Sequence, residues 1–143
     1  MIRVTRRYPF AASHRLHAPS LTDEDNSRIF GKCNNPFGHG HNYVLEVSVR
    51  GPVDRQTGVA IPLGELDGLV KTVVLDAYDH RNLNEEIPAF RDGLVPTTEN
   101  VAVEISQRLR GAWPEGFPKL EKIRIAETDR NIFEMDERDH EGQ

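Results

Sequence analysis

One stretch of the chain, FGKCNNPFGHGHNY (residues 30–43), gathers side chains that can bind a metal and move protons. It contains Cys33, the chain's single cysteine, followed by His39 and His41 around a glycine. Thiolate sulfur and imidazole nitrogen are the protein ligands that zinc prefers. Residues i and i+2 of a strand point to the same face of a sheet, so the two imidazoles are expected to reach one ion.

A third imidazole, His14, ends a strand predicted over residues 2–14. Consecutive strands often pair, which would bring His14 close to His39 and His41. Three neutral histidines with an open fourth position are typical of catalytic zinc, which can polarise a substrate oxygen. The alternative is a closed structural site with Cys33 as fourth ligand. The residues alone do not decide between the two arrangements. His17 and His140 are interpreted as ordinary surface histidines.

Two further features carry ionisable groups. Asp79 precedes His80, and a carboxylate can fix the tautomer of a histidine, although sequence neighbours do not always bond. Glu127 shares the parity of apolar residues in the preceding strand, so its carboxylate is expected to point inward. An inward carboxylate must meet donors, either in a salt bridge or in a ligand with paired N–H groups. Cys33 needs a nearby base before it can act, because a free thiol titrates near pH 8.5.

Composition restricts the class of protein. With 143 residues, 37% hydrophobic and 29% charged, the chain is expected to form one domain (1–143) with a charged, solvated tail from about 136. No apolar run approaches the roughly 20 residues of a membrane span, and the first residues do not resemble a signal peptide. The net charge of −5 without a basic block argues against nucleic acid. A single cysteine suits the cytoplasm.

The hydrophobic pattern predicts six elements. Alternation indicates strands, and apolar residues three or four apart indicate amphipathic helices. The strands are expected over residues 2–14, 40–50, 119–128 and 132–135, and the helices over 63–77 and 96–113. The order β-β-α-α-β-β favours an α+β fold, a four-stranded antiparallel sheet with two helices on one face. Residues 14–39 show no periodicity, and long loops of this kind are often functional.

Several segments in succession resemble the 6-pyruvoyltetrahydropterin synthase family. They are FAASHRL, DEDNSRIFGKCNNPFGHGHNY, VDRQTGVAI, DHRNLN, PTTENVAVEI and AETDRNI, and they extend from about Phe10 to Ile132. The related 6-carboxytetrahydropterin synthases of queuosine biosynthesis share the histidines, the thiol and the Asp-His pair. Their segment before the His-X-His is shorter, so this chain is more similar to the pyruvoyl type.

The resemblance implies a role for each matching residue. His14, His39 and His41 would bind Zn²⁺, and Cys33 would be the catalytic proton acceptor. Asp79 and His80 would relay its charge from a neighbouring subunit. Glu127 would hold the pterin ring, with Thr97 and Thr98 contributing to its pocket.

The resemblance also implies a tunnelling fold, a homohexamer built as a dimer of trimers, and a reaction. The expected substrate is 7,8-dihydroneopterin triphosphate, converted to 6-pyruvoyltetrahydropterin with release of triphosphate. The alternative product is 6-carboxytetrahydropterin. Arg15 and Lys32 are candidates for the triphosphate by proximity alone. Two departures from the family pattern are Pro62, ahead of the first helix, and a C-terminus without the Tyr-X-Gly of many members.

Overall fold

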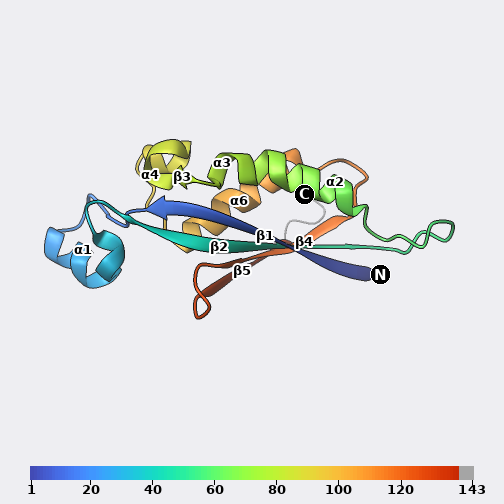
Figure 1. Cartoon of the computed structure of the whole chain (residues 1–143), viewed down its shortest axis with the longest axis horizontal. Coiled ribbons are helices and arrows are strands. Elements are labelled where there is room, and N and C mark those ends of the chain that lie inside the picture. Colours follow the sequence, from blue (N-terminus) through green and yellow to red (C-terminus); the bar gives the residue numbers. More distant parts are fainter. Residues whose placement is uncertain (139–143) are drawn as a thin grey trace.

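The computed structural model describes residues 1–138, and its centre is a twisted five-stranded sheet with the long helices on one side (Figure 1). The strand order is β3-β1-β2-β4-β5, and neighbouring strands are antiparallel except for β3 and β1. The strands are β1 (Ile2–His14), β2 (His39–Gly51), β3 (Arg81–Asn82), β4 (Lys119–Ala126) and β5 (Ile132–Asp136).

The four predicted strands are confirmed, and β3 is an addition to them. It pairs in parallel with β1 through Ala12↔Arg81 and Ser13↔Asn82, so the sheet is mixed and has five strands where four antiparallel strands were expected. Two residues are too few to show an alternating pattern, and this strand is defined by its tertiary contact with β1.

Two long helical segments cover the sheet, as predicted. The first runs without interruption through α2 (Leu63–Val70), the π-helical η2 (Lys71–Leu75) and α3 (Asp76–Tyr78), with Pro62 at its N-cap. The second is α6 (Thr98–Ala112), whose N-cap Thr97 accepts a hydrogen bond from the backbone N–H of Asn100. The short helices α4 (Leu83–Glu86) and α5 (Pro88–Arg91) connect them.

The segment between β1 and β2 is structured, which corrects the expectation of an irregular loop. It contains α1 (Asp23–Phe30) and the 3₁₀ turn η1 (Gly31–Asn34), which lie beyond the end of β1 in Figure 1. Thr22 caps α1 by accepting from the N–H of Asp25 at 3.1 Å, and three acidic residues occupy the first turn. The helix is short and mostly exposed, so it has no apolar stripe for a periodicity search to find.

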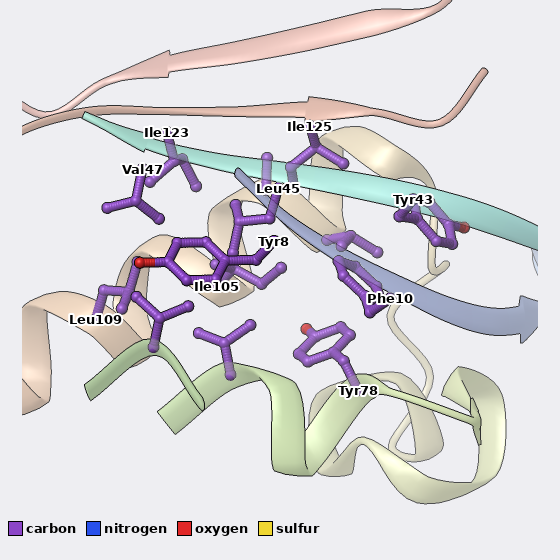
Figure 2. Close-up of a cluster of buried hydrophobic side chains, with 14 of the residues drawn as sticks. Tyr8, Phe10, Tyr43, Leu45, Val47, Tyr78, Ile105, Leu109, Ile123 and Ile125 are labelled. Carbon is purple, nitrogen blue, oxygen red and sulfur yellow. The ribbon is translucent and has the colours of Figure 1, made fainter. Parts of the chain in front are cut away.

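The core lies between the helices and the inner faces of β1, β2 and β4 (Figure 2). Leu45 and Val47 of β2 are completely buried in it. Towards the end of the sheet where β2 begins, the rings of Phe10 and Tyr43 stack with centroids 5.0 Å apart. This aromatic layer separates the apolar core from the histidines that follow it on the same face.

The expected solvated tail departs from prediction at Glu137, which is only 2% exposed. Its carboxylate accepts from the Ser106 hydroxyl and lies 3.3 Å from the Arg110 Nε. These contacts fasten the end of the described chain to α6, whereas His140 lies outside the described residues. None of the helices in residues 1–138 has the length and apolar character needed to cross a bilayer.

Candidate metal centre and active site

The pairing of β1 with β2 places the three predicted histidines together. His14 is directly opposite His39 in the register, and Ala12 is opposite His41. Directly opposed residues of antiparallel strands have their Cβ atoms about 4.5–5.5 Å apart on one face. The i, i+2 spacing of His39 and His41 adds the third ring to the same face.

The rings and the thiol form one compact group. One ligand atom from each of His14, Cys33, His39 and His41 lies within 4.8 Å of the others. Ring centroids are 4.4 Å apart for His39 and His41, and 5.0 Å apart for His14 and His41. Three imidazoles and a thiol converging at this distance are able to hold a metal ion, and their donor chemistry suits zinc.

The hydrogen bonding of His14 prepares it to be a ligand. Its Nδ1 lies 2.9 Å from the carbonyl oxygen of Pro96, which can only accept, so Nδ1 carries the proton. Nε2 is therefore the unprotonated nitrogen, and it is buried without a hydrogen-bond partner. Burial lowers the pKa of His14 and of His41, which favours the neutral imidazoles that metal binding requires. A buried, unpaired lone pair of this kind fits a metal ligand.

Cys33 reaches the group from η1, which is fastened to the segment after β1. The N–H of Leu16 donates to the Cys33 carbonyl at 2.7 Å, and the Asn34 amide donates to the Leu16 carbonyl at 2.8 Å. The Cys33 Sγ lies 2.9 Å from His39 Nε2. Burial, and then the nearby Glu127 carboxylate, raise the pKa of the thiol. Both arrangements considered from the sequence, a fourth ligand and a thiol beside an open site, fit this geometry.

Glu127 lies at the same end of the sheet, as its parity predicted. The register of β2 with β4 pairs Leu45 with Ile125, and Glu127 follows two residues later on the same face. One carboxylate oxygen is 3.1 Å from His41 Nε2, and the other accepts from the Thr98 hydroxyl at 2.9 Å. Thr98 thus contacts Glu127 directly, whereas the Thr97 side chain serves as the helix cap.

Asp79 and His80 form a dyad that is separate from the metal group. The Asp79 carboxylate lies 3.1 Å from His80 Nδ1 and accepts from the N–H of Ala11 at 2.9 Å. The His80 N–H donates to the Ala11 carbonyl at 2.6 Å, so both residues are fixed to the edge of β1. The His80 side chain is 83% exposed, and no hydrogen bond or ion pair joins it to Cys33 within residues 1–138.

His80 has a backbone φ of 61°, the one non-glycine residue of the described chain with a positive φ. L-residues avoid this conformation, and it persists only where surrounding contacts enforce it. The bond from the His80 N–H to the Ala11 carbonyl, and the bond from the Ala11 N–H to the Asp79 carboxylate, provide that enforcement.

One contributor to the site was missed from the sequence. The Pro96 carbonyl sets the His14 tautomer, but a backbone oxygen leaves no mark of its own in a sequence. A proline followed by two threonines at a helix start did indicate where that carbonyl is presented, just before α6.

Comparison with known proteins agrees with this geometry. The family model described as 6-pyruvoyl tetrahydropterin synthase matches residues 3–138. A 6-pyruvoyl tetrahydrobiopterin synthase of Poecilia reticulata is 47% identical, over 90% of this chain and 86% of that protein. A solved Caenorhabditis elegans 6-pyruvoyl tetrahydropterin synthase superimposes with a TM-score of 0.85 at 40% identity, covering 94% of each chain. A 6-carboxy-5,6,7,8-tetrahydropterin synthase of Rickettsia bellii is 27% identical, over 94% of both chains. The chain therefore belongs to the 6-pyruvoyl tetrahydropterin synthase family.

Proposed function

We propose that the chain is a zinc-dependent lyase that converts 7,8-dihydroneopterin triphosphate to 6-pyruvoyltetrahydropterin and triphosphate, in tetrahydrobiopterin biosynthesis. The observation that carries the proposal is the group of three imidazoles and one thiol within 4.8 Å, with the Glu127 carboxylate beside it. The proposal is further supported by the greater similarity to pyruvoyl-type than to carboxy-type relatives. The free thiol of Cys33 is consistent with a reducing, cytoplasmic location.

The metal would be held by His14, His39 and His41. When bound, zinc supplies a Lewis acid that lowers the pKa of nearby hydroxyl groups. The Pro96 carbonyl keeps the His14 Nε2 lone pair directed at the site, as outer-shell partners of metal-bound histidines commonly do.

Glu127 would bind the pterin ring through its carboxylate, which can accept from the ring N–H and the 2-amino group together. The Thr98 hydroxyl holds one carboxylate oxygen and so limits the rotation of the side chain. This fixes the ring relative to the histidines, since Glu127 lies 3.1 Å from His41 Nε2. Charged hydrogen bonds of this kind contribute about 1.5–3 kcal/mol each.

Cys33 would accept and return protons at the carbons of the substrate side chain. The reaction is an internal redox change coupled to elimination: hydrogen leaves the side chain, the ring is reduced, and triphosphate departs. No external oxidant or reductant is needed for the balance. Its Sγ lies 2.9 Å from His39 Nε2, so the thiol is directly beside the imidazoles that would hold the metal.

The relay of Asp79 and His80 would act on a neighbouring copy. Its imidazole is exposed at the edge of β1 and makes no described contact with Cys33 of its own chain. We infer a homohexamer, a dimer of trimers, in which each active site combines Cys33 from one copy with His80 from another. Mixing inactive Cys33→Ala and His80→Ala proteins tests this, because about a quarter of the sites then regain both groups. Recovery of no activity after subunit exchange would contradict a shared site.

The reaction is tested by anaerobic incubation of the zinc-loaded protein with 7,8-dihydroneopterin triphosphate, followed by mass spectrometry. A 6-pyruvoyl product with triphosphate supports the proposal, whereas a 6-carboxy product with acetaldehyde supports the alternative. His39→Ala is expected to lose both zinc and turnover. Cys33→Ala is expected to keep zinc and lose turnover, and loss of zinc would instead indicate that the thiol is a ligand of a closed site.

A further inference from the structure

A pocket of about 660 Å³ opens next to the metal group, on the side of α1 and η1. His39 is part of the metal group and also lines the pocket, so the two adjoin each other. The pocket lining also includes the charged or polar residues Arg15, Asp23, Ser27, Lys32 and Asn34. A cavity of this size is typical of small-molecule sites.

Arg15 and Lys32, the two cationic residues of this pocket, lack the carboxylate partner that most other cationic residues of the described chain have. Neither Arg15 nor Lys32 forms an ion pair within residues 1–138, although most lysines and arginines there lie against a carboxylate. The other cations without an ion pair in that range are scattered, and they are Arg55, Lys119 and Arg130. Two cations without carboxylate partners in one pocket are a feature that an anionic ligand satisfies.

Hydrogen bonds position the backbone segments that carry the two cations. The Arg15 N–H donates to the Asn84 side chain at 2.7 Å, and the Arg15 carbonyl accepts from the same amide at 2.9 Å. The Arg15 Nε donates to the Asn34 carbonyl at 3.3 Å, which leaves the outer nitrogens of the guanidinium for a ligand. Lys32 lies on η1, immediately before Cys33, and η1 is bound to the segment after β1. The pocket is thus preformed next to the thiol.

We propose that this pocket binds the phosphate chain of the substrate, with Arg15 and Lys32 as its cationic contacts. The inference rests on the proposed function, and it names the residues that orient the leaving group. Phosphate oxygens accept from guanidinium and ammonium groups, and the Ser27 hydroxyl and Asn34 are further polar groups on the wall. The Asp23 carboxylate in the same wall repels an anion. Removing its charge is therefore expected to strengthen triphosphate binding, whereas removing Arg15 or Lys32 is expected to weaken it.

The experiment measures KM for 7,8-dihydroneopterin triphosphate and the inhibition constant of inorganic triphosphate, using zinc-loaded protein. Arg15→Gln and Lys32→Gln are each expected to raise both constants about tenfold, the effect of losing one charged hydrogen bond. Asp23→Asn is expected to lower both. Arg55→Gln and Lys119→Gln, which remove unpaired cations elsewhere, are the matched controls and are expected to behave as wild type.

Direct titration calorimetry with inorganic triphosphate separates this inference from the proposed function. If wild type binds triphosphate and both pocket variants weaken it, the pocket is supported even if the pterin substrate is not turned over. If turnover occurs and both variants keep wild-type constants, the pocket assignment is overturned and the proposed function remains. Arg15 also contacts Asn34, so Arg15→Gln can fold poorly. The Lys32 side chain has no described partner. If Arg15→Gln does fold poorly, Lys32→Gln alone decides whether the pocket binds triphosphate. Zinc content and thermal unfolding of each variant are measured in parallel.

Discussion

The contact between Thr98 and Glu127 gives the most discriminating prediction, because one hydroxyl positions the proposed pterin ligand. Thr98 is 3% exposed, and its hydroxyl donates to a Glu127 carboxylate oxygen at 2.9 Å. Thr98→Val replaces that hydroxyl with a methyl group of similar size, so the packing at the start of α6 is retained. The carboxylate then loses a donor in a site where only 12% of its side chain is exposed.

The expected cost follows from the charge of the acceptor. A hydrogen bond to a charged group contributes about 1.5–3 kcal/mol, and the lower end applies here because water can partly replace the hydroxyl. The free energy of unfolding is therefore expected to fall by about 1.5 kcal/mol. KM for the pterin substrate is expected to rise as Glu127 gains freedom to rotate, while zinc content stays unchanged.

Thr5→Val is the matched control. The Thr5 hydroxyl bonds the Ser48 hydroxyl at 2.7 Å, a neutral pair on the opposite face of the sheet. Its loss is expected to cost about 0.5–1.5 kcal/mol and to leave KM unchanged. Urea unfolding at fixed protein and zinc concentrations, together with steady-state kinetics, provides both quantities. A Thr98→Val protein with wild-type KM would refute the positioning role of the hydroxyl.

Three further predictions concern stability. Leu45→Ala, in the fully buried core, is expected to lower the free energy of unfolding by about 2–5 kcal/mol in urea titrations. The Arg6 guanidinium and the Tyr8 hydroxyl lower the pKa of Asp67, so its stabilising contribution is present above the unfolded pKa and is lost as pH falls through the folded value. Asp67→Asn is therefore expected to reduce the fall in melting temperature between neutral and acidic pH, as measured by melting curves recorded across pH. His80→Gly is expected to be more stable than His80→Ala by about 1 kcal/mol, since glycine accepts a positive φ, while both lose turnover; equal melting curves would argue against strain.

The sheet and the histidine group were predictable because they depend on periodicity. Alternation in β1 and β2 fixes which residues share a face, so His14, His39 and His41 had to converge once the two strands paired. The position of Glu127 followed from the alternation of β4, because Glu127 comes directly after the strand and shares the parity of Ile123 and Ile125. The functional assignments came from the resemblance, because parity says where a carboxylate points and not what it binds.

Elements without a period were not predictable in the same way. The two-residue β3 is defined only by its contact with β1, and the exposed α1 has no apolar stripe. For α1 a local signal did exist, since a threonine followed by three acidic residues is typical of a helix start. Glu137 had no such signal, because a buried carboxylate in a charged segment is recognisable only once Ser106 and Arg110 are seen beside it.

The backbone strain at His80 bears on the proposed site shared between copies. A left-handed histidine costs roughly 1–2 kcal/mol relative to ordinary backbone, and no packing advantage offsets this, because the side chain is 83% exposed. The His80 N–H donates to the Ala11 carbonyl and the Ala11 N–H donates to the Asp79 carboxylate; these two bonds enforce the conformation, and the same carboxylate lies against the exposed imidazole. A glycine at this position would make the same N–H bond to the Ala11 carbonyl without the strain. The proposed relay to the Cys33 of another copy would give the imidazole a role beyond its own chain that accounts for this cost.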